Sequence, residues 1–294
     1  ALYPRSCFDY FAKKWPLKLT CTQFSPVLPN NYKETSYPVA NYVWRGKNTT
    51  KEPIKLAIML TWENILGWDV TWPKAVHNSE QCYFIKKPGN TIHKVVDTAA
   101  QVNLVLSHKK KSGQFCLSVP KHKDYIISYQ KDFDPEGSGR VVAAPFKKRG
   151  ILNNIPVVTD KKRNAGALAL KLVVQPGAEI EIPFTLSWDI PRHEFKNNKY
   201  FNRYYTKYFG VNGENAQKVA TVALQNYAQW EKVIERWQAP YLEKYEPWFA
   251  SFLFNEMYYL ADGGTIWDAK TGDFGLLECY DYFFYETFNN YSMS

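Results

Sequence analysis

The carboxylate of Glu256 lies in the middle of an apolar, aromatic-rich run that extends from Pro247 to Trp267. A carboxylate in such a run is paired with a cation, buried at a cost in free energy, or chemically active. Pro is tolerated in the first turn of a helix, and the Gly263-Gly264 pair can end one in a left-handed turn. We therefore expect a helix that carries Glu256 about two turns from its start.

The apolar side chains of this run recur at helical spacing, which predicts one buried helix face. The members of that face are Phe249, Phe252, Leu253, Met257 and Leu260. Asn255 and Glu256 lie beside the face rather than opposite it. The helix alone is therefore compatible with two roles for Glu256, a glutamate at the rim paired with Lys or Arg, or a catalytic carboxylate.

Other catalytic chemistries have little support in the sequence. All five histidines precede the Glu256 run, and none of them has HxH or HExxH spacing. The chain also lacks GxGxxG, Walker and GxSxG motifs. We therefore predict no metal site and no histidine-dependent nucleophile in the C-terminal segment. Carboxylate chemistry among aromatic side chains remains, and its commonest use is glycoside hydrolysis by two carboxyl groups.

The composition indicates a globular chain with a large aromatic content. Its 294 residues include 10 Trp, 21 Tyr and 18 Phe, and 45% of them are hydrophobic. This length suits one large domain or two ordinary ones. Aromatic rings fill cores, and they also line sugar sites, where a flat ring meets the C–H face of a pyranose.

Part of the net charge of +9 lies in three basic clusters, which we expect to be solvated loops: Lys109–Lys111, Lys147–Arg149 and Lys161–Arg163. They lack interleaved aromatic residues and do not form a recognisable basic helix, so no nucleic-acid partner is predicted. A minor interpretation is that folding gathers the clusters into a site for an anionic surface, such as a peripheral membrane contact.

The cysteines and the absence of export or membrane signals predict a cytoplasmic protein. The five cysteines are odd in number, widely spaced and without a CxxC pair, which suits a reducing compartment. No stretch reaches the roughly 18 consecutive apolar residues of a membrane span, and the first residues lack a signal-peptide core. Any membrane contact is therefore expected to be peripheral, and no pattern indicates an oligomeric state.

From residue 17 to residue 190 the hydrophobic period is two, which predicts strands. The alternating segments are residues 17–21, 39–44, 54–62, 102–106, 115–119, 125–129, 168–174 and 180–188. The last two are joined by Pro176-Gly177, and we expect them to pair as a hairpin because Pro and Gly favour the dihedrals of a tight turn. Many half-buried strands without intervening helices predict antiparallel sheets in a two-sheet β-sandwich.

After residue 191 the period becomes helical. The segment from Asn215 to Tyr241 carries an apolar stripe, formed by Val219, Val222, Ala223, Tyr227, Trp230, Val233, Ile234 and Trp237. Asn212, Glu214 or Asn215 is expected to cap this helix, and Pro240 is expected to mark its end. The predicted fold class is therefore mainly β and then α.

The motif LFNEMYYLADGGTIW at Leu253–Trp267 resembles the nucleophile segment of glycoside hydrolase family 116, a family of β-glucosidases and glucosylceramidases. Other segments resemble the same family in the same order: LTCTQFSPVLPNNYKETSYPV at Leu19–Val39, LTWENILGW at Leu60–Trp68, FTLSWDIP at Phe184–Pro191, RYYTKYFG at Arg203–Gly210 and WQAP at Trp237–Pro240. The resemblance thus covers most of the chain.

The resemblance implies a retaining glycosidase that acts on β-glucosides or glucosylceramide without a cofactor. Glu256 matches the nucleophile of the family. Residues that match neighbouring motif positions and are implied as substrate contacts are Asp262, Trp267, Glu278, Asp281 and Thr287. The acid/base of the family is an aspartate well downstream of the nucleophile, and we expect it to lie outside this sequence. The chain alone is therefore not expected to complete a turnover.

The implied domains are an N-terminal β-sandwich at residues 1–195, linking helices at 196–246 and the truncated start of an (α/α)6 catalytic barrel at 247–294. A competing interpretation is a non-catalytic β-sandwich module that binds a glycan or an anionic membrane surface. A third is a non-catalytic homologue in which Glu256 is only structural.

Overall fold

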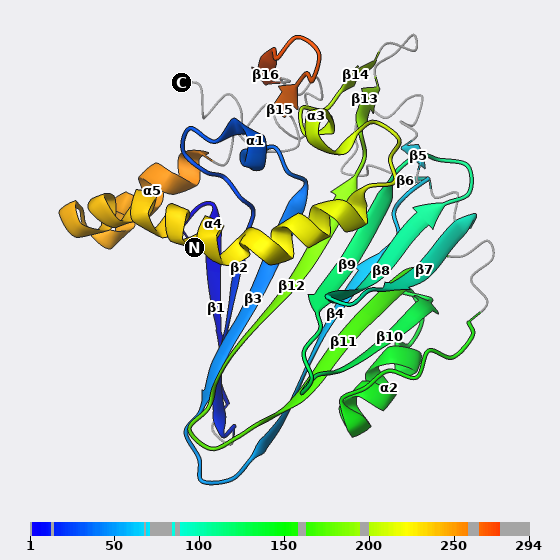
Figure 1. The fold of residues 1–294 in the computed structure, drawn as a ribbon, viewed down its shortest axis with the longest axis vertical. Helices are drawn as coiled ribbons and strands as arrows, with labels where there is room; N and C mark the ends of the chain where they lie inside the picture. The colour runs from blue at the N-terminus through cyan, green and yellow to red at the C-terminus, as the bar shows by residue number, and fades with distance from the viewer. Residues whose placement is uncertain are drawn as a thin grey trace, which may run out of the picture.

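The computed structural model describes residues 2–12, 15–67, 69–70, 84–85, 89–157, 163–194, 200–257 and 265–276. Two antiparallel sheets face each other, and a long helix that follows them along the chain packs on the outside of the larger sheet (Figure 1). The alternating segments of the sequence all form strands, so the prediction of a mainly β and then α fold with a two-sheet sandwich is confirmed.

The larger sheet has seven strands in the order β1-β2-β3-β12-β9-β8-β7. Their bounds are Arg5–Tyr10 for β1, Leu17–Phe24 for β2, Val39–Asn48 for β3, Glu179–Asp189 for β12, Gln114–Pro120 for β9, Gln101–His108 for β8 and Thr91–Asp97 for β7. The smaller sheet has the order β10-β11-β4, with bounds Ile126–Phe133, Ala165–Val174 and Ile54–Glu63. Strands β1 and β7, the two edges of the larger sheet, are additional to the predicted ones.

The main core lies between the two sheets, because alternate residues of each strand point to the facing sheet. Its buried members include Leu104, Leu106, Leu117 and Phe184 from the larger sheet and Ile58, Leu168 and Leu170 from the smaller one. This period-two burial is the pattern that the sequence predicts.

The turn at Pro176-Gly177 forms, but it does not make the predicted hairpin. The Gln175 carbonyl accepts from Ala178 N at 3.0 Å, and Gly177 has φ 73°. However, β11 pairs with β10 and β4, whereas β12 pairs with β3 and β9. The turn therefore connects the two sheets. Asn48 at the end of β3 holds this corner, since its carbonyl accepts from Gly177 N at 2.9 Å and its Nδ2 donates to the Val174 carbonyl at 2.9 Å.

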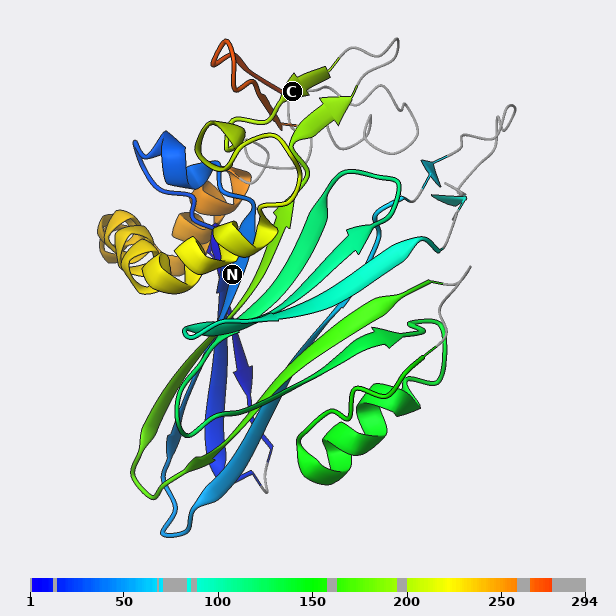
Figure 2. The same cartoon turned by 45° about the vertical axis from the view of Figure 1, so that its right-hand side comes forward.

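Helix α2, Arg140–Arg149, was not expected between the strands, and it places the basic cluster Lys147–Arg149 in a last helical turn rather than in a loop. Its Pro145 disfavours a helix by propensity. Val142 and Phe146 nevertheless pack on β11 of the smaller sheet, and cations are favoured near the C-terminal end of a helix. Figure 2 shows α2 on the smaller sheet, remote from α4 (Ala216–Lys244).

Helix α4 lies across the outer face of the larger sheet (Figures 1 and 2). The predicted stripe is confirmed: Val219, Ala223, Trp230 and Ile234 are buried with Phe24, Val39 and Val43. The expected end at Pro240 is wrong, because the helix continues to Lys244. Trp237 and Tyr241, on either side of Pro240, both pack edge-on against Phe254 of α5 (Pro247–Glu256), which keeps this turn helical.

Helix α5 buries a different face from the predicted one. Ala250 and Phe254 are its buried residues, whereas Phe252 is 56% exposed and Trp248 72% exposed. The reason is that α5 turns Phe254 toward α4 rather than packing a wider stripe into a core. The helix ends at Glu256, earlier than the expected end at Gly263-Gly264. Leu260 and the two glycines lie outside the described residues.

Short elements complete the described chain. Helices α1 (Tyr32–Thr35) and α3 (Thr206–Phe209) are single turns. Three two-stranded ribbons pair β5 (Asp69–Val70) with β6 (Phe84–Ile85), β13 (Arg192–Glu194) with β14 (Tyr200–Asn202), and β15 (Thr265–Trp267) with β16 (Phe274–Leu276). Among the described residues, no helix combines the length and the hydropathy of a membrane span.

Candidate functional site

Glu256 is the last residue of α5, and its side chain is exposed. Two contacts fix this end of the helix. The Asn255 Oδ1 accepts from Tyr3 N at 2.9 Å, and Phe254, 2% exposed, packs against α4. Within the described ranges no Lys or Arg forms an ion pair with Glu256.

Trp267, on β15, lies in an aromatic cluster with Tyr32 of α1 and Tyr204, which precedes α3. The indole stacks on the Tyr204 ring with a centroid distance of 4.0 Å and an interplanar angle of 13°. Tyr32 meets Trp267 edge to face at 5.6 Å and 85°. Offset-stacked and edge-to-face pairs are the favourable aromatic geometries, so three distant parts of the chain meet here with good packing.

Two lysines accompany this cluster. Lys207 Nζ lies 4.3 Å from the Tyr204 ring centroid. Lys33 Nζ lies 5.2 Å from the ring centroid of Tyr208, and the Tyr208 ring packs edge-on against Tyr204. Both ammonium groups therefore lie over the face of a tyrosine ring, the position that favours a cation–π contact. Flat rings flanked by hydrogen-bonding groups are the surface that a sugar ring requires.

Figures 1 and 2 show that α1, α3 and the β15-β16 ribbon gather at one end of the sandwich, and that α5 lies beside α1. Backbone contacts hold the ribbon in this place. Ala269 N donates to the Asn202 carbonyl at 2.8 Å, and Arg203 and Asp268 form a β-bridge. The Asp268 carboxylate accepts from Thr271 N at 2.8 Å, and this bond is the main reason why its pKa is lowered.

The structure thus places two of the predicted site residues, Glu256 and Trp267, on elements that approach the same end of the sandwich. The other four predicted contacts lie outside the described residues: Asp262, Glu278, Asp281 and Thr287. In the described part of the chain, no group of three or more His, Cys, Asp or Glu side chains is arranged to hold a metal ion.

A buried carboxylate near this end was not anticipated from the sequence. Asp189, the last residue of β12, is 0% exposed and accepts hydrogen bonds from Tyr205 and Asn215. The alternation Thr185, Ser187, Asp189 predicts a polar, solvated face of a strand. That face is buried instead because α4 lies across it. The apolar stripe of α4, which follows in the sequence, was the available signal that a helix would cover this face of the sheet.

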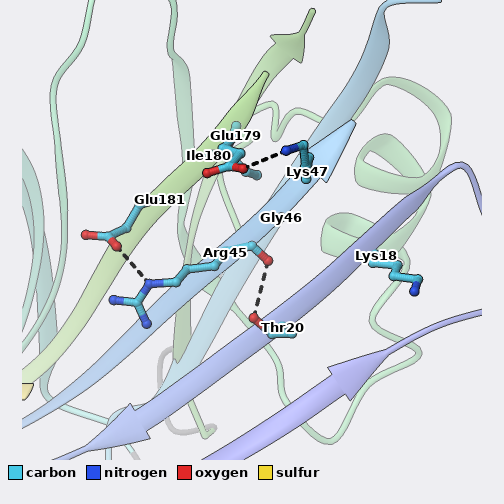
Figure 3. A pocket seen from close by; sticks show the side chains of 8 residues that line it. All are labelled: Lys18, Thr20, Arg45, Gly46, Lys47, Glu179, Ile180 and Glu181. Carbon is cyan, nitrogen blue, oxygen red and sulfur yellow. Dashed lines mark hydrogen bonds and ion pairs between the residues drawn. The ribbon is translucent and has the colours of Figure 1, made fainter. Parts of the chain in front are cut away.

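The outer face of the larger sheet also bears an open groove beside the middle of α4. Its lining residues are Lys18, Thr20, Arg45, Gly46, Lys47, Glu179, Ile180 and Glu181 (Figure 3). Cross-strand ion pairs occupy it: Arg45 Nε meets Glu181 Oε2 at 2.7 Å, and Lys47 Nζ meets Glu179 Oε1 at 2.9 Å. Charges that neutralise one another in this way make a weak ligand site.

The Arg45 guanidinium extends from this groove to α4. It donates to Glu231 Oε1 at 3.0 Å and Oε2 at 2.6 Å. Glu181 accepts from the Tyr227 hydroxyl at 2.7 Å. Burial would raise the pKa of Glu181, but the hydrogen bonds from Tyr227 and Arg45 outweigh burial and lower it. These contacts attach α4 to the sheet, so their role is structural.

The basic clusters lie on separate elements. Lys109–Lys111 directly precede Ser112, whose hydroxyl donates to the Asn212 carbonyl at 3.4 Å, while Lys147–Arg149 end α2 on the smaller sheet. Arg163 is paired with Glu63 and Glu136, and residues 161–162 are outside the described ranges. The described members of the three clusters therefore do not form one basic patch.

Comparison with known proteins gives one family match. Residues 1–230 match the family model described as beta-glucosidase 2, glycosyl-hydrolase family 116 N-term. This match ends before Glu256. It covers the sandwich, α3 and the first half of α4.

Three solved structures with some likeness are distant in sequence. A putative kojibiose phosphorylase from the human microbiome has a TM-score of 0.36 and 9% identity, over 87% of this chain and 23% of that one. A putative aldose 1-epimerase from Klebsiella pneumoniae has a TM-score of 0.31 and 10% identity, over 63% and 50%. A family GH92 alpha-mannosidase from Bacteroides thetaiotaomicron has a TM-score of 0.28 and 8% identity, over 92% and 31%. The chain thus spans at most half the length of these three proteins.

Proposed function

The chain belongs to glycosyl-hydrolase family 116, whose N-terminal model matches residues 1–230, and we propose that it is the N-terminal part of a retaining β-glucosidase with Glu256 as nucleophile. The proposed substrates are β-glucosides, with glucosylceramide among them. Residues 247–294 then begin the (α/α)6 catalytic domain, after the sandwich at 1–195 and the linking helices at 196–246.

In the proposed reaction the Glu256 carboxylate attacks the anomeric carbon and forms a covalent glycosyl-enzyme, while a carboxylic acid protonates the departing glycosidic oxygen. Water, deprotonated by the same second group, then releases the sugar with retained configuration. The two carboxyl groups must be about 5 Å apart. We propose that the second group is an aspartate outside this sequence, so this chain by itself would not turn over substrate.

The observation that carries the proposal is the placement of Glu256 within its motif. A retaining nucleophile must be ionised, accessible and fixed on a rigid element. Glu256 is exposed at the end of a helix that Asn255 ties to Tyr3 and that Phe254 ties to α4. The absence of an ion pair to Glu256 within the described residues leaves its carboxylate available for a substrate.

We propose that Trp267 forms part of the sugar site, supported by its place in the aromatic cluster. Asp262, Glu278, Asp281 and Thr287 are proposed as further contacts on the motif alone. A cytoplasmic location fits the free thiols of Cys7, Cys21 and Cys116.

The test is covalent trapping. A 2-deoxy-2-fluoro-β-glucoside inactivator is incubated with the chain extended to its complete reading frame, and the adduct is located by peptide mass mapping. We expect the label on Glu256 and none on the Glu256→Gln variant. The matched control is Glu243→Gln, which changes an exposed glutamate on the neighbouring helix α4. This variant should still be labelled on Glu256. Labelling at another residue, or undiminished labelling of Glu256→Gln, contradicts the assignment.

The competing proposal, a non-catalytic module for a glycan or an anionic membrane surface, is tested separately with vesicles that contain phosphatidylserine. Neutralising Lys109–Lys111 and Lys147–Arg149 would abolish vesicle binding if these clusters formed such a surface. Because they lie on different elements, we expect no dependence on them. Vesicle binding that survives Glu256→Gln but is lost on neutralisation would favour the module.

A further inference from the structure

Asp189 is a fully buried carboxylate that accepts three hydrogen bonds. Its Oδ1 accepts from the Tyr205 hydroxyl at 2.8 Å, and its Oδ2 accepts from Asn215 N at 2.7 Å and from Asn215 Nδ2 at 3.1 Å. An ionised carboxylate is costly to bury unless its oxygens are satisfied in this way. The arrangement therefore depends on Tyr205 and Asn215 staying where they are.

These two partners fix both ends of one segment. Tyr205 immediately precedes α3, and Asn215 immediately precedes α4. Burial and the neighbouring Asp189 raise the pKa of Tyr205, so its hydroxyl keeps the proton that it donates. The Asp189 carboxylate at the end of β12 thus anchors both ends of the segment 205–215 to the larger sheet through hydrogen bonds.

The residues next to Tyr205 connect this hydrogen-bonded segment to the aromatic cluster. Arg203 N donates to the Pro191 carbonyl at 2.8 Å, which holds the chain against the residues after β12. Tyr204, the direct neighbour of Tyr205, presents its ring to Trp267 at 4.0 Å. On the other side, Ala269 N is bonded to the Asn202 carbonyl. Residues 202–205 therefore lie between the sandwich and β15, with contacts to both.

We propose that Asp189 is a positioning residue for Trp267. It holds Tyr205, Tyr205 sets the position of the adjacent Tyr204 ring, and that ring supports one face of the indole. Aromatic side chains in binding sites recognise ligands best when a second layer of contacts fixes their rotamers. The proposal rests on the proposed function only in treating Trp267 as a sugar contact, because the chain of contacts itself does not involve Glu256.

The position of Trp267 can be read by ¹⁹F NMR of this chain labelled with 5-fluorotryptophan. The sequence has ten Trp residues, and Trp267→Phe identifies the signal of interest as the one that disappears. The stacked Tyr204 ring shifts that signal by its ring current, and Tyr204→Leu defines the signal without the stack. The other nine signals report on whether each variant keeps the fold.

We expect Asp189→Asn and Tyr205→Phe to move the Trp267 signal toward its place in Tyr204→Leu. In the first variant an amide donor faces Asn215 N, and in the second the hydroxyl is lost without a change in ring size. The matched control is Ser187→Ala on the same strand, which removes a buried bond to the Ala216 carbonyl of α4 (2.6 Å) that does not involve Tyr205. Its Trp267 signal should stay unshifted.

If Asp189→Asn fails to fold, the Trp267 signal of Tyr205→Phe tests the positioning role by itself. An unshifted Trp267 signal in folded Tyr205→Phe overturns the proposal. So does an equal shift in Ser187→Ala, since the effect would then be a general loosening under α4. Trapping of the fluoroglucoside on Glu256 does not depend on the Trp267 signal. An unshifted NMR signal therefore leaves the nucleophile assignment intact, and a failure to trap the sugar on Glu256 leaves the positioning role of Asp189 intact.

Discussion

Arg45 on β3 and Glu231 on α4 form a two-pronged hydrogen-bonded ion pair, with Nη1 and Nη2 at 3.0 and 2.6 Å from the two carboxylate oxygens. The Glu231 side chain is 8% exposed. The pair is thus one of the polar links between the larger sheet and the helix that leads to α5, beside the Tyr227–Glu181 hydrogen bond. Geometry of this kind belongs to Arg, since the ammonium of Lys cannot reproduce the fork.

Arg45→Lys is therefore expected to destabilise the chain. Arg45 is one-third exposed, so we expect a loss of about 1–2 kcal/mol in the free energy of unfolding, less than for a fully buried pair. Urea denaturation measures it. The control is Lys47→Ala, which removes the exposed pair with Glu179 and should cost less than about 1 kcal/mol. Equal losses in the two variants would contradict the role given to Arg45.

Asp132 should make stability depend on pH in the acid range. Burial alone would raise the pKa of Asp132, but hydrogen bonds from His93 and Asn164 outweigh burial and lower it below 3.8. A lowered carboxyl pKa contributes stability that is fully present above the unfolded value and is lost as pH falls through the folded value. The contribution should therefore decline below about pH 4.

The check is a series of urea denaturations between about pH 2.5 and 6. Asp132→Asn should flatten the acid limb of the curve of unfolding free energy against pH. Asp9→Asn, on the edge strand β1, is the control and should retain that limb. An identical acid limb in Asp132→Asn and the unmodified chain would count against the inferred shift.

Two tryptophans should differ in their contribution to stability. Trp230 of α4 is 1% exposed and packs near Tyr37, whereas Trp248 of α5 is 72% exposed. Trp230→Ala is expected to cost about 3–5 kcal/mol because it leaves a cavity between α4 and the larger sheet. Trp248→Ala should change the free energy of unfolding by less than about 0.5 kcal/mol. Thermal and urea unfolding of both variants compare them, and a small loss for Trp230→Ala would contradict the observed packing.

Trp267→Ala should slow covalent trapping of the fluoroglucoside by the extended chain. If the indole contacts the sugar, its loss removes roughly 1.4 kcal/mol, or about a tenfold decrease in the inactivation rate constant per unit of inactivator. Trp248→Ala, which removes an exposed indole outside the aromatic cluster, should leave the rate unchanged. An unchanged rate for Trp267→Ala in a folded enzyme would remove Trp267 from the proposed sugar site without affecting Glu256.

The two candidate residues of the site differ in how far the sequence could place them. The FNE motif identifies Glu256, and Pro247 correctly marks the start of its helix. Its role as nucleophile stays a prediction. Trp267 could be identified as a site candidate from the motif, but its partners could not, because Tyr32 and Tyr204 are distant in the sequence. Contacts between distant segments leave no periodic signal in either one.

The sequence by itself determined the elements whose burial is one-sided. A period of two defines β4 and β8, and a period near 3.6 defines the Trp230 stripe of α4, because such patterns record which side of an element meets a core. The turn at Pro176-Gly177 likewise follows from local dihedral preferences.

Only the tertiary structure decided which elements meet. The residues of the Pro176-Gly177 turn do not determine which strand pairs with β12. Packing between the two sheets placed β12 beside β3 and β9 rather than beside β11. The helix α4 turned the polar alternation that ends in Asp189 into a buried face, and α5 kept the turn around Pro240 helical. Each outcome depends on burial by a distant segment, and that free energy exists only once the chain has folded.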